Sequence, residues 1–179
     1  TYIAQSLRPS EWCIFLNQTY PDPEYRKLFR ELDFRVALSV AINRDRINDV
    51  LYFGLASIEP ATPLKFMPWF DDAWYNDYLE YDPDRANKLL DGLGLTKRDS
   101  EGYRLLPDGR RLSIIQEIST VKAQVGGDQF CELLAEDWKA IGVETTCKAL
   151  ESGVIAQHRN DNEIMALNWH LGRATLLGR

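Results

Sequence analysis

The spacing of hydrophobic residues predicts two consecutive helices over residues 34–54. Apolar residues recur there at helical spacing, and the polar stretch NRDR at 43–46 interrupts the pattern in its middle. Asn43 is a good helix N-cap, and Asp45 lies in the first turn after it, where the helix dipole favours a carboxylate. Gly54 can close the second helix. The polar stretch therefore predicts a corner, with one helix ending and another starting at Asn43.

Three more helices are predicted farther along the chain. Asp82 and Pro83 mark the start of a helix over 81–95 as its cap and first residue. An amphipathic stripe predicts a long helix over 121–141, and residues 152–160 form a shorter helical pattern.

Strand patterns alternate with these helices. Residues 12–19 are rich in β-branched and aromatic side chains, and 103–118 form a hairpin pattern about a Pro-Asp-Gly turn. Further strands are predicted at 143–150 and 163–169. The alternation predicts an α/β fold in which helices flank a mixed sheet, and we expect residues 1–179 to form a single domain.

Composition and charge exclude several function classes. The chain has 179 residues, is 45% hydrophobic and carries a net charge of −6. It has no Lys/Arg run that could follow a phosphate backbone, so nucleic acid is not an expected partner. No apolar run is long enough to span a bilayer. No signal-peptide pattern opens the chain, and we expect it to be a segment excised from a longer protein.

The cysteines are three and widely spaced. Cys13, Cys131 and Cys147 include no C-x-x-C pair, which argues against a zinc ribbon or a redox pair. We expect them to be buried thiols rather than disulfide partners. The cellular compartment does not follow from this count.

Four motifs, in a consistent order, resemble one protein family. They are "FRVALSVAINRDRINDVLYFG" at 34–54, "YDPDRANKLLDGLGL" at 81–95, "DGRRLSI" at 108–114 and "LLAEDWKAIGVET" at 133–145. Each motif is weak alone, but together they are similar to the extracellular solute-binding proteins of ABC transporters, family 5, the peptide, nickel and oligosaccharide type. The resemblance implies a periplasmic-binding-protein type II-like fold of the kind seen in domain 3 of dipeptide-binding proteins.

The resemblance also implies a function and partners. In that family two lobes close on a solute, and the matching stretches belong to the second lobe. We therefore expect a substrate-capture lobe that binds an oligopeptide or oligosaccharide without a cofactor and delivers it to an ABC transporter permease in the membrane. The resemblance implies an extracellular or periplasmic location, often as a lipoprotein, with any membrane anchor outside this chain. The polar stretch 43–46 is then expected to specify the fold, through a cap and an arginine pairing across the corner.

The end of the last strand holds the first candidate site. In peptide-binding relatives an aspartate closely follows the tryptophan that matches Trp169 and anchors the ligand's amino group. Here His170-Leu171-Gly172-Arg173 follow instead, without a carboxylate. Trp169 with Asn168, His170 and Arg173 would suit a sugar or an acidic group. The alternative is that Trp169 is a core residue and Arg173 a solvated charge.

Other candidates are less specific. Trp69 and Trp74 lie in the aromatic-rich stretch 57–81, where they could equally pin a covering loop to the domain. Asn17 follows the first strand. Glu117 and Thr120 lie at the end of the strand at 112–118 and could face a cleft.

Two other functions compete with solute capture. A glycosidase would need two carboxylates across a cleft, and Asp71, Asp72 and Glu80 lie near aromatic residues. However, the sequence has no nucleophile–base or phosphate-binding motif, and its two histidines, His158 and His170, have no third ligand at metal spacing. We therefore expect a protein that is not an enzyme. A pure protein-interaction module remains the other alternative.

Overall fold

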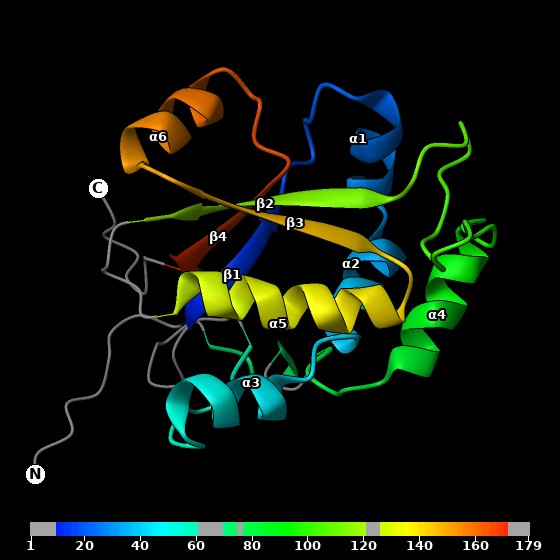
Figure 1. Cartoon of the computed structure of the whole chain (residues 1–179). Coiled ribbons are helices and arrows are strands. Elements are labelled where there is room, and N and C mark those ends of the chain that lie inside the picture. Colours follow the sequence, from blue (N-terminus) through cyan, green and yellow to red (C-terminus); the bar gives the residue numbers. More distant parts are fainter. Residues whose placement is uncertain (1–9, 61–69, 75–76, 121–125, 172–179) are drawn as a thin grey trace, which may run out of the picture.

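A mixed four-stranded sheet organises the described part of the chain. The computed structural model describes residues 10–60, 70–74, 77–120 and 126–171 (Figure 1). The strands are β1 (Ser10–Leu16), β2 (Ser113–Ser119), β3 (Glu144–Leu150) and β4 (Ala166–Leu171), in the order β1-β4-β2-β3. β2 runs parallel to both of its neighbours, whereas β1 is antiparallel to β4. The predicted α/β class with a mixed sheet is confirmed.

Helices cover both faces of this sheet. They are α1 (Pro23–Arg30), α2 (Leu32–Val40), α3 (Arg44–Tyr52), α4 (Pro83–Gly92), α5 (Gly127–Ala140) and α6 (Ser152–Asn160), with a 3-10 helix at Asp72–Trp74. The connection from β2 to β3 carries α5 over one face, and the connection from β3 to β4 carries α6 over the other (Figure 1). This follows from the right-handedness of crossovers, because β3 and β4 lie on opposite sides of β2.

The corner at Asn43 forms as the sequence predicts. α2 ends at Val40 and α3 begins at Arg44, and the Asn43 side chain accepts a hydrogen bond from the Arg46 N–H at 3.0 Å. Arg46 also donates to Asp137 of α5 at 2.8 Å, and the Asn43 N–H donates to the same carboxylate at 2.9 Å. Burial raises the pKa of Asp137, so these two donors stabilise a carboxylate that water does not reach. The polar stretch thus fastens α3 to α5.

The main core lies between the sheet, α5 and the α2–α4 pair. Trp138 of α5 is almost fully buried, and its indole N–H donates to the Leu38 carbonyl at 3.0 Å. The same core contains apolar side chains from α2, α4, α5 and the start of β2, among them Phe34, Ala37, Leu90, Leu112, Ile114 and Leu134. The predicted turn at 107–109 is also present: the Leu106 N–H donates to the Arg110 carbonyl, and Gly109 adopts a φ of 89°, which favours glycine.

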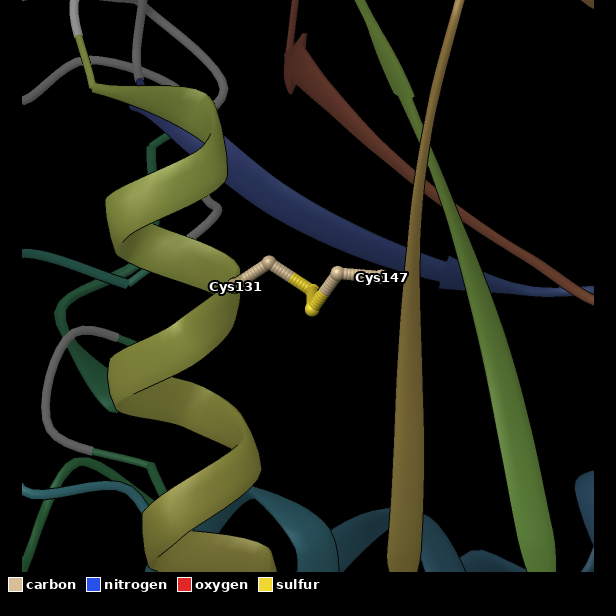
Figure 2. Close-up of a disulfide and its surroundings, with 2 residues drawn as sticks. All are labelled: Cys131 and Cys147. Atoms are coloured by element: carbon tan, nitrogen blue, oxygen red, sulfur yellow. A yellow bond between two sulfur atoms is a disulfide. The ribbon is translucent and has the colours of Figure 1, made fainter.

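Two of the three cysteines form a disulfide, which corrects the expectation of buried thiols. Cys131 of α5 is bonded to Cys147 of β3, with their Cα atoms 6.1 Å apart (Figure 2). The sequence does not reveal this pairing because it depends on how α5 lies over the strand that follows it. Cys13 lies outside this disulfide and is buried in β1.

Candidate functional site

The carboxyl ends of the parallel strands meet at one side of the sheet. We call this side the carboxyl edge and define it by residues 119–120, 150–152 and 169–171. Ser119 pairs with Leu150, the Thr120 N–H donates to the Leu150 carbonyl at 2.9 Å, and the Ser119 and Ser152 hydroxyls are 3.0 Å apart. The chain leaves β2 and β3 toward opposite faces here. Such a point at the carboxyl ends of strands is where α/β sheets usually bind ligands.

Trp169 lies near this edge with a partly exposed indole. It pairs with Cys13 across the antiparallel ladder, and the neighbouring pair joins Leu167 to Phe15. Because directly opposed residues share a face, Phe15, Leu167 and Trp169 form what we call the aromatic strip. Phe15 is 43% exposed and Trp169 37% exposed. Trp169 is therefore not a core residue, in contrast to the alternative that the sequence left open.

The aromatic strip lies on the face that α6 partly covers. Leu167 is also opposite Glu117 of β2, and the Glu117 carboxylate lies 2.9 Å from Nδ1 of His158 in α6. Glu117 is only 5% exposed. This contact holds α6 on the sheet, and Glu117 is buried beside Leu167 on the same face, where it is not exposed to a solute. Thr120, by contrast, is exposed at the carboxyl edge.

Asn168 does not join Trp169. Successive strand residues face opposite sides of a sheet, and Asn168 points toward α5 beside Ile14 of β1. It is fully buried, and its side-chain amide has no hydrogen-bond partner. The alternation of side chains along a strand explains this separation, because adjacent residues such as Asn168 and Trp169 cannot share a face. We leave Asn168 out of the proposed site.

Asn17 has a role within the fold. Its side-chain N–H groups donate to the Asn162 side chain at 2.9 Å and to the Ile164 carbonyl at 2.8 Å, and its oxygen accepts from Thr19. These bonds join the β1–α1 and α6–β4 connections. They lie at the end of β1 opposite the Ser10–Leu171 pair, away from the carboxyl edge. We also leave Asn17 out of the site.

The remaining candidates fall where the structure gives no side-chain description. Trp69 and Arg173 lie outside the described residues. Trp74 ends the 3-10 helix and His170 lies in β4, but their side chains are likewise outside the described part. Their participation in binding stays a prediction.

Two of the carboxylates considered for a glycosidase have partners within the fold. Asp71 accepts a hydrogen bond from the Ala73 N–H at 2.9 Å, and Glu80 is paired with Arg85. Within the described ranges, no three His, Cys, Asp or Glu side chains converge as a metal site, and no helix there is long and apolar enough to cross a membrane.

Comparison with known proteins identifies the family. Residues 3–175 match the family described as bacterial extracellular solute-binding proteins, family 5, middle. The chain belongs to this family. Family 5 solute-binding proteins are transport receptors and not enzymes, which agrees with the predicted lack of catalysis.

Individual family 5 relatives and structures are similar over most of the chain. A probable ABC transporter-binding protein of Deinococcus radiodurans is 30% identical over 129 residues, which are 69% of this chain and 20% of the relative. The structure of an oligopeptide-binding protein, OppA, is 38% identical with a TM-score of 0.88, and the match covers 96% of this chain and 26% of that one. The family 5 domain described above thus spans about a fifth to a quarter of these relatives.

More distant structures share the fold alone. The periplasmic binding protein MelB of Agrobacterium fabrum C58, solved in complex with stachyose, is 18% identical with a TM-score of 0.74. The match covers 91% of this chain and 26% of MelB. The fold expected from the motif resemblance is therefore confirmed by the structure at 38% identity and by the structure at 18% identity.

Proposed function

We propose that this chain is the second, ligand-binding lobe of a longer ABC importer receptor. Its carboxyl edge would close against a partner lobe and hold a solute between them. The observation that carries the proposal is the exposed aromatic strip beside the carboxyl edge, where Trp169 and Phe15 offer flat apolar surfaces. Closure of two lobes on one solute contributes affinity only when both lobes touch it.

The chemistry of the edge suits an uncharged polar solute such as an oligosaccharide. Aromatic side chains provide a surface for the apolar face of a sugar, and the exposed Thr120 can donate to and accept from its hydroxyls. The four residues after Trp169 contain no carboxylate that could anchor a peptide's amino group. An oligopeptide is the second candidate, and the 38% identity to an oligopeptide-binding protein favours it.

Thermal unfolding of the full-length gene product tests both candidates. A ligand at 100 times its dissociation constant stabilises the protein by about 2.7 kcal/mol. We expect an oligosaccharide such as stachyose to raise the Tm, and Trp169→Ala to abolish the rise. Tyr81→Ala is the matched control, because Tyr81 is 49% exposed and shortly precedes α4, a helix that lies away from the carboxyl edge (Figure 1). A full response from Trp169→Ala would contradict the proposal. The 179-residue chain alone should show no robust shift.

The disulfide supports an extracytoplasmic location. Disulfides form and persist in oxidising compartments, and the family is described as extracellular. The membrane permease and a membrane anchor outside this chain remain part of the proposal. Peptide mapping without reduction, on protein purified from its native compartment, should find the peptides of Cys131 and Cys147 linked to each other. Finding both as thiols would argue against this location.

A further inference from the structure

An apolar projection extends from the end of α3. Val50 is 56% exposed, Phe53 84% and Leu55 87%, and we call these three residues the α3 projection. Single exposed apolar residues are ordinary, but three large ones within six positions at the end of one helix are a concentration of exposed apolar side chains, and such concentrations are typical of interaction sites.

The turn that presents Phe53 and Leu55 is rigid. Asn48 holds it from both sides, because its side-chain N–H donates to the Ala56 carbonyl and its oxygen accepts from the Ala56 N–H, each at 3.0 Å. The Gly54 N–H donates to the Asn48 carbonyl at 3.1 Å, and the Leu55 N–H to the Tyr52 carbonyl at 3.0 Å. An apolar group held in place in this way loses little conformational entropy when a partner covers it.

Phe53 also has an unusual backbone. Its φ is 56°, in the left-handed region, although glycine is the usual residue where a helix ends in that conformation. A bulky side chain in this region is strained. Because the ring is exposed, it gains almost nothing from packing within this domain, so the strain has no compensation among the described residues.

The α3 projection lies on the side of the domain where the described chain enters and leaves the sheet. The Trp12 indole N–H donates to the Tyr52 hydroxyl at 2.6 Å, which joins the last turn of α3 to the beginning of β1. Ser10, at that beginning, pairs with Leu171 at the end of β4. Ser10 and Leu171 therefore lie on the same side of the domain as the α3 projection and the carboxyl edge.

We propose that the α3 projection is the point where the partner lobe of the same polypeptide docks on this domain. The inference rests on the proposed function, which makes this chain one lobe of a longer receptor. The match to OppA covers 96% of this chain but only 26% of that protein, so most of such a relative lies outside the matched segment. Its location beside the chain connections makes that remaining polypeptide the partner with the highest local concentration.

A pair of double variants tests this inference. Phe53→Ser/Leu55→Ser is made in the full-length gene product and in the 179-residue chain. Leu32→Ser/Val154→Ser is the matched control, because Leu32 is 56% exposed and Val154 40% exposed on α2 and α6. In the 179-residue chain both variants should unfold at nearly the wild-type temperature, since exposed side chains contribute little to stability. In the full-length protein the first variant alone should lower the Tm, by about 2–4 °C.

Several results would overturn the inference. One is an equal change in Tm in both proteins or in neither. Another is a 179-residue chain that is dimeric in sedimentation and becomes monomeric in the first variant, which would make the α3 projection a self-interface. A variant that keeps its Tm but no longer associates with the permease would assign the surface to that partner instead. A gene product no longer than this chain would also refute it.

Ligand titration of the same full-length proteins separates the two proposals. If a solute raises the Tm of the wild type but Phe53→Ser/Leu55→Ser leaves the Tm unchanged, the docking inference fails and the solute-binding proposal stands. If no oligosaccharide or peptide raises the Tm while the first variant lowers it, the solute-binding proposal fails and the docking surface stands.

Discussion

Reduction of the Cys131–Cys147 disulfide should destabilise the domain by an amount that its loop length sets. The two residues are 16 positions apart, and closing a loop of that size lowers the entropy of the unfolded chain. The chain-entropy relation gives about 3 kcal/mol at 25 °C for such a loop. The cross-link joins β3 to α5, whose Leu134 and Trp138 lie in the main core, so we expect its effect on the unfolding of the whole domain.

Urea unfolding measures this directly. With an m-value of about 2 kcal/mol/M, dithiothreitol should lower the midpoint of urea unfolding by about 1.5 M. The variant Cys131→Ala/Cys147→Ala is the control. It keeps Cys13, so its midpoint should not respond to dithiothreitol if the response of the wild type comes from the disulfide.

Equal midpoints for oxidised and reduced wild type would refute the reasoning. So would a double variant that still responds to dithiothreitol, because the effect would then come from Cys13. A loss much larger than 3 kcal/mol on reduction alone would show that the bond also holds native packing in place.

Other contacts give smaller, separate predictions. Asn43→Ala should lower the free energy of unfolding by about 1 kcal/mol in urea titrations, through loss of the α3 cap; no change would mean that the cap is dispensable. Arg46→Ala should lower the free energy of unfolding by about 1–3 kcal/mol, because the buried Asp137 carboxylate loses a donor. Arg85→Ala is the comparison, because its partner Glu80 is exposed, and a smaller loss for Arg46→Ala than for Arg85→Ala would contradict the prediction. The Arg110 ion pair lowers the pKa of Asp22, so this carboxylate stabilises the fold above about pH 4 and the contribution is lost as pH falls through the lowered value. Tm measured from pH 2 to 6 should therefore fall less steeply in Arg110→Ala, and an unchanged slope would refute the assignment.

Local signals in the sequence predicted the helices well where a cap defined them. Asp82 caps α4 through the Arg85 N–H at 2.8 Å, and Pro83 is its first residue, as predicted. The corner at Asn43 was predicted equally well, because a cap depends on neighbours within three residues. The end of α3 was predicted less accurately, because Phe53, not Gly54, is the first residue in the left-handed conformation.

The site was predicted only in part because its contacts are long-range. Trp169 could be singled out because it ends the apolar run at 163–169, and its role in binding stays a prediction. The Glu117–His158 contact and the Cys131–Cys147 bond depend on which face each crossover helix covers, and this depends on the strand order. The pairing of β1 with β4 is also invisible to local patterns, although it places Phe15 beside the strand that carries Trp169.

The β1–β4 ladder has a consequence for how this domain matures. The first strand of the sheet pairs with the last, and Cys13 is opposite Trp169 in this ladder. Nearly the whole segment must therefore be available before β1 and β4 can pair. Contacts between such distant residues form late and slowly. The sheet of this segment therefore stays incomplete until β4 is available, and we expect it to fold more slowly than a sheet whose paired strands are adjacent in the sequence.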